Sequence, residues 1–346
     1  MKCLYGLIAA GGLLLTQSLF GGNVWHVNNQ AVNASDSNPG TEAEPFLTIN
    51  AATTNEHFEA GDTVLVYPGV YNSGKAVSTY LTRVLIPKKT YLRAVGNAEN
   101  TIIEGALGTD SYNLGNNALR CIVIGDGGAG TEVKGFTLRN GATKNADGTA
   151  TGSGGGVLSS PADAYIVDCV ISNCAAFKGG GIYGGTAVRS FFYKNSARGP
   201  SSSGNSGSAA NNANLFCCVI DSCSGARAND LNAALSESIP VNCTIVNCKT
   251  GIFISKNSKN KRQAYNCVFS GIAGNDMAGY AVLNKCTTTA SQGAYQLIGP
   301  GVGDYRILST IGGETLECAA TQAATTLKLP EEYRAVDFAG NFFPKQ

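Results

Sequence analysis

The sequence predicts an all-β solenoid, in which short strands wind into stacked coils. Similar strand-like segments recur at intervals of 21 to 34 residues, Gly, Asn and Ser separate them, and no helical period of 3.6 residues appears between them. These intervals leave no room for crossover helices, which excludes a doubly wound α/β sheet. The repeated segments are "VKGFTLRN" from Val133, "VDCVISNC" from Val167, "VRSFFYKN" from Val188, "FCCVIDSC" from Phe216, "VNCTIVNC" from Val241 and "YNCVFSGI" from Tyr265.

Stacked coils bring equivalent residues of successive repeats together, because parallel strands lie ~4.8 Å apart. Alternation of side chains along each strand then predicts which columns face the core. The first cysteine of each pair becomes a small apolar side chain in an inward ladder. The expected inward columns are Val133, Val167, Val188, Phe216, Val241 and Tyr265; Gly135, Cys169, Ser190, Cys218, Cys243 and Cys267; and Thr137, Ile171, Phe192, Ile220, Ile245 and Phe269.

The second cysteine of each pair is expected where the coil bends. Asn is suited to this position because its side chain bonds neighbouring backbone. A zinc site is disfavoured, since His partners and Cys-x-x-Cys spacing are missing. Disulfides between stacked neighbours remain an open alternative, although the eleven cysteines left after Cys3 cannot all pair with one another. This column contains Asn140, Cys174, Asn195, Cys223 and Cys248.

Two Gly-Gly-Gly runs, at 154–156 and 179–181, each precede an apolar strand-like segment. Close approach of two coils at a bend leaves no room for a β-carbon, so we interpret these runs as packing sites. A phosphate-binding loop is the alternative, but neither run ends in Lys-Ser/Thr or opens a helix.

The N-terminus predicts export. Lys2, the apolar run "LYGLIAAGGLLL" and small residues near Gly21 are typical of a secretory signal peptide. A short membrane anchor is the competing interpretation, although the run is shorter than the ~20 residues of a membrane span. The formal net charge of +1 and the 14% of charged residues argue against a basic nucleic-acid-binding face.

The start of the mature chain, "WHVNNQAVNASDSNPGTEAEPFLTINAA" followed by "AGDTVLVYPGVY", resembles secreted right-handed parallel β-helix proteins of the pectate-lyase-like superfamily. The words "GGGIY" and "FYKN" resemble repeats of bacterial polymorphic outer-membrane adhesins. The resemblance implies a single right-handed parallel β-helix, secreted by a bacterium or held at its outer cell surface. It specifies fold better than function, because the superfamily includes lyases, hydrolases and adhesins.

Four segments are expected along the chain. They are a signal peptide at 1–21, an N-terminal strand and helical cap at 22–60, the β-helix at 61–290 and a C-terminal capping segment at 291–346. The cap helix is expected in "PFLTINAATTNEHF", where Phe46, Ile49, Ala52 and Phe58 follow roughly helical spacing. It would cover the open end of the first coil.

The sequence contains no recognisable catalytic or metal-binding motif. The paired carboxylates and Gly-His-Gly word of polygalacturonase-type hydrolases are missing. Calcium needs clustered carboxylates, whereas Asp168, Asp221, Asp230 and Asp276 stand singly. The sequence therefore predicts no cofactor, and calcium has no support in the motifs.

The outward columns provide the candidate ligand-binding residues. Phe136, Phe191 and Tyr193 would offer aromatic faces to pyranose rings, beside charges for carboxylates or hydroxyls. In one alternative, the charges alternate in sign as an ion-pair ladder; in another, the apolar outward column lies under the C-terminal segment. The candidate residues are Lys134, Asp168, Arg189, Tyr193 and Asp221.

These observations predict an exported protein that binds polysaccharide or cell-surface glycan, or mediates adhesion, without a catalytic motif. The alternative is a polysaccharide lyase or related carbohydrate-active enzyme that acts on uronate-containing glycans, with catalytic residues spread one per coil. Basic residues and an Asp gathered in one solvent-open groove would favour the enzyme.

Overall fold

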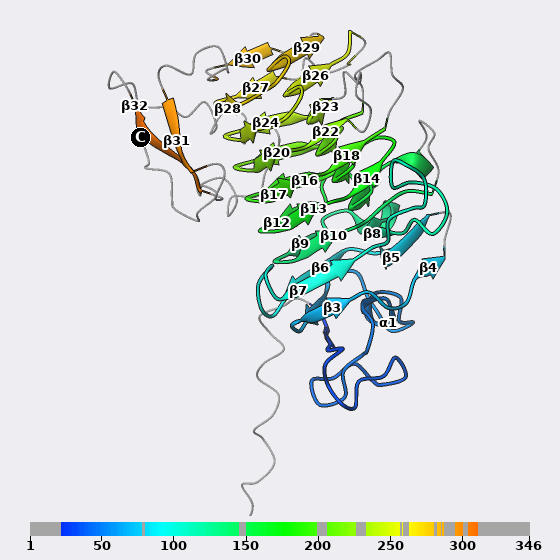
Figure 1. Cartoon of the computed structure of the whole chain (residues 1–346). Helices are drawn as coiled ribbons and strands as arrows, with labels where there is room; N and C mark the ends of the chain where they lie inside the picture. The colour runs from blue at the N-terminus through cyan, green and yellow to red at the C-terminus, as the bar shows by residue number, and fades with distance from the viewer. Residues whose placement is uncertain are drawn as a thin grey trace, which may run out of the picture.

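A computed structural model of the protein describes residues 22–77, 80–144, 150–198, 206–225, 233–256, 258, 263–279, 282–284, 286, 295–299 and 304–310. Its parallel strands stack coil upon coil in three long sheets, which we name A, B and C (Figure 1). This confirms the predicted right-handed parallel β-helix. The predicted signal peptide and the C-terminal segment, apart from the hairpin of β31 (Tyr295–Gly299) and β32 (Asp304–Thr310), lie outside the described residues.

The strands of each sheet follow one another in coil order, and nearly all pair in parallel. Sheet A comprises β1 (Val24–Val27), β2 (Asp62–Val66), β6 (Thr90–Ala94), β9 (Glu132–Lys134), β12 (Tyr165–Val167), β16 (Thr186–Val188), β20 (Asn214–Phe216), β24 (Ile239–Val241), β27 (Gln263–Tyr265) and β30 (Val282–Asn284). Sheet B comprises β3 (Gly69–Tyr71), β7 (Thr101–Glu104), β10 (Thr137–Arg139), β13 (Val170–Ser172), β17 (Phe191–Tyr193), β21 (Val219–Asp221), β25 (Thr244–Val246) and β28 (Val268–Ser270).

Sheet C contains one antiparallel pair, β4 with β5, at its first edge. Its strands are β4 (Ala76–Val77), β5 (Leu81–Ile86), β8 (Arg120–Ile124), β11 (Val157–Ser159), β15 (Ile182–Tyr183), β19 (Ala210–Asn211), β23 (Leu235–Ser236), β26 (Ile252–Ile254) and β29 (Met277–Gly279). A small additional sheet joins β14 (Ala175–Ala176), β18 (Ser196–Ala197) and β22 (Ser224–Gly225), and two 3₁₀ turns form at η1 (Asp126–Gly128) and η2 (Ala150–Gly152).

A single residue in left-handed conformation forms the bend between sheets A and B. Its φ is 53° at Asp168 and 46° at Arg189. A second such residue follows sheet B, with φ of 52° at Asn173 and 51° at Lys194. Each bend redirects the chain within one residue, so the two-residue alternation of side chains does not continue from one sheet into the next.

From the second repeat on, these bends make the first predicted inward column wrong, whereas Val133 in the first repeat lies in the core as predicted. The residue before each bend packs outside the main core, in a separate buried cluster of Val167, Val188, Phe216 and Val241. Their strand neighbours Ile166, Ala187 and Leu215 occupy the core instead. The expected alternation assumed one continuous strand through the bend. Because the bend interrupts the strand, the residue before it faces outward instead of inward.

The first repeat also lies one residue out of the predicted alignment, because Lys134 pairs with Val167 rather than with Asp168. Gly135 and Asn140 consequently stand at the two bends, with φ of 81° and 57°. The inward positions predicted for Gly135 and Thr137 belong to Phe136 and Leu138, both fully buried.

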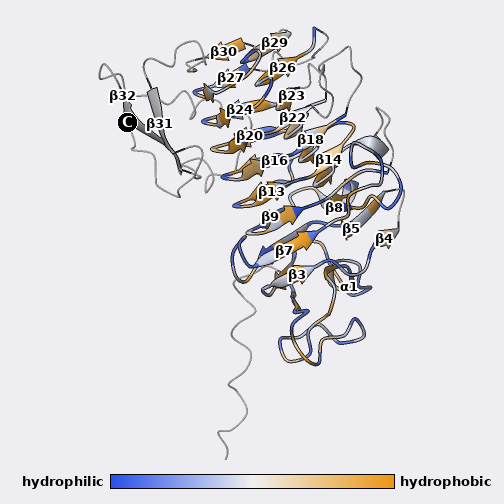
Figure 2. Cartoon of the chain, viewed as in Figure 1, coloured by the Kyte–Doolittle hydropathy of each residue, from blue (hydrophilic) through white to orange (hydrophobic). Residues whose placement is uncertain are grey.

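The other two inward columns are confirmed beyond this first coil, and Figure 2 shows apolar residues following the stacked strands. Within the ladder, the Cys169 thiol donates to the Val167 carbonyl at 3.2 Å, and the Ser190 hydroxyl donates to the Val188 carbonyl at 3.0 Å. The two side chains therefore make equivalent hydrogen bonds. Serine replaces cysteine in this column without leaving its hydroxyl unsatisfied.

The second-cysteine column also points inward, directly after the second bend. Asn195 bonds backbone as expected: its amide Nδ2 donates to the Ile171 carbonyl at 2.8 Å, and its Oδ1 accepts from the Cys174 amide at 3.0 Å. Within the described residues, all ten cysteines are free thiols.

The predicted cap helix forms at α1 (Ile49–Thr53), beside the first strands at the N-terminal end of the solenoid (Figure 1). The Thr48 side chain caps it by accepting from the Ala51 amide. Phe46, Ile49, Ala52 and Phe58 are buried, as their spacing predicts. Within the described ranges, no helix is long and apolar enough to span a membrane.

The glycine runs pack as expected. A β-carbon on Gly180 would lie 2.1 Å from the Ser196 carbonyl oxygen and 2.6 Å from that of Ser208. We expect Gly180→Ala to lower the free energy of unfolding by about 2–3 kcal/mol, because backbone must move to admit the methyl group. Urea unfolding measures this. Gly125→Ala is the control, since its nearest contact would be an ordinary 3.7 Å; equal losses in the two variants would contradict the packing explanation.

Candidate functional site

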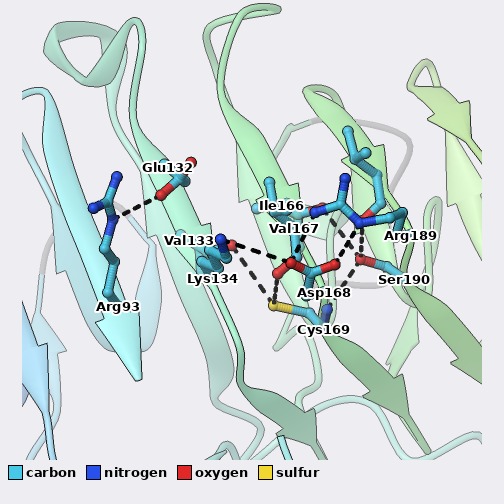
Figure 3. A network of polar contacts seen from close by, with 11 residues as sticks. Arg93, Glu132, Val133, Lys134, Ile166, Val167, Asp168, Cys169, Arg189 and Ser190 are labelled. Carbon is cyan, nitrogen blue, oxygen red and sulfur yellow. Dashed lines mark hydrogen bonds and ion pairs between the residues drawn. The ribbon is translucent and has the colours of Figure 1, made fainter. Parts of the chain in front are cut away.

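Three predicted site residues meet at the bend between sheets A and B (Figure 3). Arg189 donates from Nε and Nη2 to the two carboxylate oxygens of Asp168, at 2.7 and 2.9 Å. Lys134 approaches the same carboxylate from the preceding coil, with Nζ 3.9 Å from Oδ2. The charges alternate in sign from coil to coil, as in the predicted ion-pair ladder.

The side chains of these three residues differ in their exposure to solvent. The Arg189 side chain is only 10% exposed, whereas Asp168 and Lys134 are 36% and 45% exposed. Because it is buried and makes a bidentate contact, the Arg189 guanidinium holds Asp168 in position and has little surface left for a ligand. Lys134 is therefore the cation of this group that a ligand in solvent can reach.

Aromatic side chains continue this surface on the outer face of sheet B. The rings of Phe191 and Tyr193, both half-buried, stack with their centroids 5.8 Å apart and their planes at 20°. The exposed Lys194 places its Nζ 4.9 Å from the Tyr193 ring centroid. A hydrogen bond with Tyr193 raises the pKa of Lys194, so its ammonium group is charged at neutral pH.

Two residues expected in this surface do not contribute to it. Phe136 lies in the core because of the register shift of its coil. Asp221 pairs with Tyr193 in the strand register but is only 5% exposed. Its Oδ1 accepts from the Ser222 hydroxyl at 2.8 Å and from Asn247 Nδ2 at 3.0 Å. This buried carboxylate holds neighbouring coils together instead of facing solvent.

The outer face of sheet B is thus half-exposed on the coils of β13 and β17 and more buried on later coils, where Val219, Val246 and Val268 are buried. Whether the C-terminal segment covers them, as one alternative expects, falls largely outside the described residues. We call the half-exposed part the aromatic–charged strip, and define it as Lys134, Asp168, Arg189, Phe191, Tyr193 and Lys194.

A further carboxylate lies on the same face, at Glu104. Burial opposes its ionisation, but hydrogen bonds from Arg139 and Asn140 outweigh this and lower the pKa of Glu104. Glu104 is therefore ionised at neutral pH and is unsuited to act as a general acid. Among the residues with described positions, no three His, Cys, Asp or Glu side chains gather as a metal site, and no calcium site is seen there.

A cavity that the sequence did not predict opens at the corner between sheets C and A. Its volume is about 320 Å³, and Tyr80, Asp126, Tyr183 and Asn212 line it. These residues come from four separate parts of the chain. The local sequence around Tyr183 contains the glycine pair Gly184 and Gly185, to which no role is assigned from the sequence.

Comparisons with known proteins find similarity in structure but not in sequence. No family model and no curated protein sequence matches the chain. The structure is similar to pectin methylesterase PemA from Erwinia chrysanthemi, at 12% identity and a TM-score of 0.47, over 94% of this chain and 98% of that one. The structure is also similar to a pectate lyase, at 12% identity and a TM-score of 0.40, over 94% of this chain and 88% of that one. Similarity to a rhamnogalacturonan lyase has 14% identity and a TM-score of 0.39, over 76% of this chain and 62% of that one. At such identities the likeness concerns the fold alone.

Proposed function

We propose that this chain is an exported bacterial protein that binds acidic polysaccharide at the cell surface through the aromatic–charged strip. The observation that carries the proposal is the stacked pair of Phe191 and Tyr193, half exposed beside the cation of Lys194. Export rests on the signal-like N-terminus, and the adhesin-like repeats are compatible with a surface role.

The chemistry of the strip suits a uronate-containing glycan. Aromatic faces pack against the apolar C–H faces of pyranose rings, and the exposed ammonium groups of Lys134 and Lys194 attract uronate carboxylates. The Asp168 carboxylate, which would repel such a ligand, is neutralised by its bidentate contact with Arg189. Binding, rather than bond cleavage, is what these groups support.

We expect the double variant Phe191→Ala/Tyr193→Ala to bind polygalacturonate about tenfold more weakly than the wild type, because each ring contributes about 0.5–1.5 kcal/mol. Affinity electrophoresis and calorimetric titration of the purified mature chain measure this. Tyr91→Ala is the matched control: Tyr91 also has cations over its ring, Lys89 at 5.3 Å and Arg93 at 5.2 Å, but lies on sheet A.

Equal affinities of the folded double variant and the wild type would exclude the strip as the binding site. The same samples should be assayed for new reducing ends, with calcium and with chelator. Release of reducing ends from polygalacturonate would replace the binding proposal with the lyase alternative, since a binding protein leaves the polymer intact.

A further inference from the structure

The cavity of about 320 Å³ at the corner between sheets C and A is separate from the aromatic–charged strip. Its volume lies near the lower end of the ~300–1,000 Å³ typical of small-molecule sites. It is therefore large enough to admit a sugar ring.

The fold builds the floor of the cavity from the outer face of sheet C. Tyr183 pairs with Leu158 in the strand register, and both face outward because their neighbours Ile182 and Val157 lie in the core. The turn that follows Tyr183 consists of two glycines, Gly184 and Gly185, with φ of 73° and 71°. A β-carbon on Gly184 would lie 2.3 Å from the Ser159 carbonyl oxygen, so the turn needs glycine to pack this closely.

A second tyrosine, Tyr80, forms part of the wall and is held from within the protein. The guanidinium carbon of Arg120 lies 5.6 Å from its ring centroid. Arg120 is itself 2% exposed and hydrogen-bonded to backbone carbonyls. The Tyr80 ring is thus placed before any ligand arrives, which lowers the entropic cost of binding.

Polar groups complete the lining. Asp126 and Asn212 are exposed and supply a carboxylate and an amide, and Ser160 adds a hydroxyl. Carboxylate oxygens accept hydrogen bonds, whereas amide and hydroxyl groups both donate and accept. This set matches the many hydroxyl groups of a sugar. Among the described residues that line the cavity, none is basic, so Asp126 is the only charge and opposes a negatively charged ligand.

From this geometry we infer a second carbohydrate site, in which the tyrosines Tyr80 and Tyr183 and the polar groups of Asp126 and Asn212 bind a neutral hexose ring. The site selects against uronates, which is the reverse of the preference proposed for the strip. The two sites therefore recognise different chemistry on one molecule. The inference does not depend on the strip being a binding site.

The test titrates the full mature chain with three neutral probes, the hexasaccharides of β-1,4-glucose, β-1,4-mannose and β-1,4-galactose, and with hexagalacturonate. Saturation-transfer NMR detects contact, and calorimetry measures affinity. We expect at least one neutral probe to bind, Tyr183→Ala to weaken it at least tenfold, and Asp126→Asn to weaken it about fivefold while raising affinity for hexagalacturonate. Asp163→Asn, an exposed carboxylate in the neighbouring turn outside the lining, is the control and should change neither affinity.

Absence of binding by all three neutral probes at millimolar concentration would overturn the inference. So would retention of full affinity in Tyr183→Ala, shown to be folded by its melting temperature. Loss of neutral-probe binding in Phe191→Ala/Tyr193→Ala, with Tyr183→Ala unaffected, would assign the sugar to the strip instead. Binding of hexagalacturonate to the strip is measured in a separate titration. The proposals for the strip and for the cavity can therefore be contradicted independently.

Discussion

Replacing Arg120 with methionine is expected to lower the free energy of unfolding by about 3–5 kcal/mol. The side chain is buried, and its guanidinium donates to the carbonyls of Leu81, Thr151 and Ser153, with the Ser153 contact at 3.0 Å. Burial lowers the pKa of Arg120 to about 10, so the group is still charged at neutral pH. Methionine fills similar volume but has no donor, and hydrogen bonds from a charged group contribute about 1.5–3 kcal/mol each.

Chemical denaturation of both proteins at pH 7 measures the loss. Arg83→Met is the matched control, because Arg83 also donates to backbone carbonyls, those of Gly74 and Glu104, but is only half-buried. We expect about 1 kcal/mol there, since water replaces the lost contacts. A loss at Arg120 no greater than at Arg83 would show that burial does not strengthen these hydrogen bonds.

The cysteine ladder is expected to make the protein unusually sensitive to alkali. Burial raises the pKa of the Cys169 and Cys223 thiols from 9.0 to about 12, and raises that of Cys248 well above 9.0. The unfolded chain releases these protons near pH 9, while the folded protein retains them. Stability from the neutral thiols is therefore full below pH 9 and is lost as pH rises toward 12, by about 1.4 kcal/mol per pH unit for each thiol.

Urea unfolding between pH 8.5 and 11 measures this slope, and a variant with Cys169→Ser and Cys223→Ser isolates it. The variant should lose stability with pH less steeply, by about 2.8 kcal/mol per pH unit, because two titrating groups are absent. Ser190→Ala is the control: it alters the same ladder but removes no ionising group, so its slope should match that of the wild type. A wild-type slope in the double variant would mean that the thiols already ionise in the folded protein.

Part of the candidate site was predictable from the repeats. Aligning the coils placed Asp168 and Arg189 in one column, and their observed contact follows from that column. Lys134 was assigned to the same column by a misaligned repeat, yet it reaches Asp168 because its side chain is long enough to span one residue of register. The burial of Asp221 was not predictable, since it depends on what packs against the outer face of a strand rather than on the strand itself.

The bends carried a signal that the alignment did not use. Gly, Asn or Asp occupies many of the positions with positive φ, among them Gly135, Asp168, Asn173, Asn242 and Asn247. These are the residue types that adopt left-handed geometry most readily. Arg189, Lys194 and Cys217 occupy equivalent positions without that preference, which obscures the pattern in any single repeat.

The sequence by itself determined the stacked β coils, two of the three inward columns beyond the first repeat, the cap helix and the glycines between coils, because each depends on local periodicity and side-chain size. Only the tertiary structure decided whether the residue before each bend faces the core, which charged side chains stay exposed and where a cavity forms. Tyr80, Asp126, Tyr183 and Asn212 show the reason. They meet because separate coils turn at the same corner, and no local pattern within one coil records that meeting.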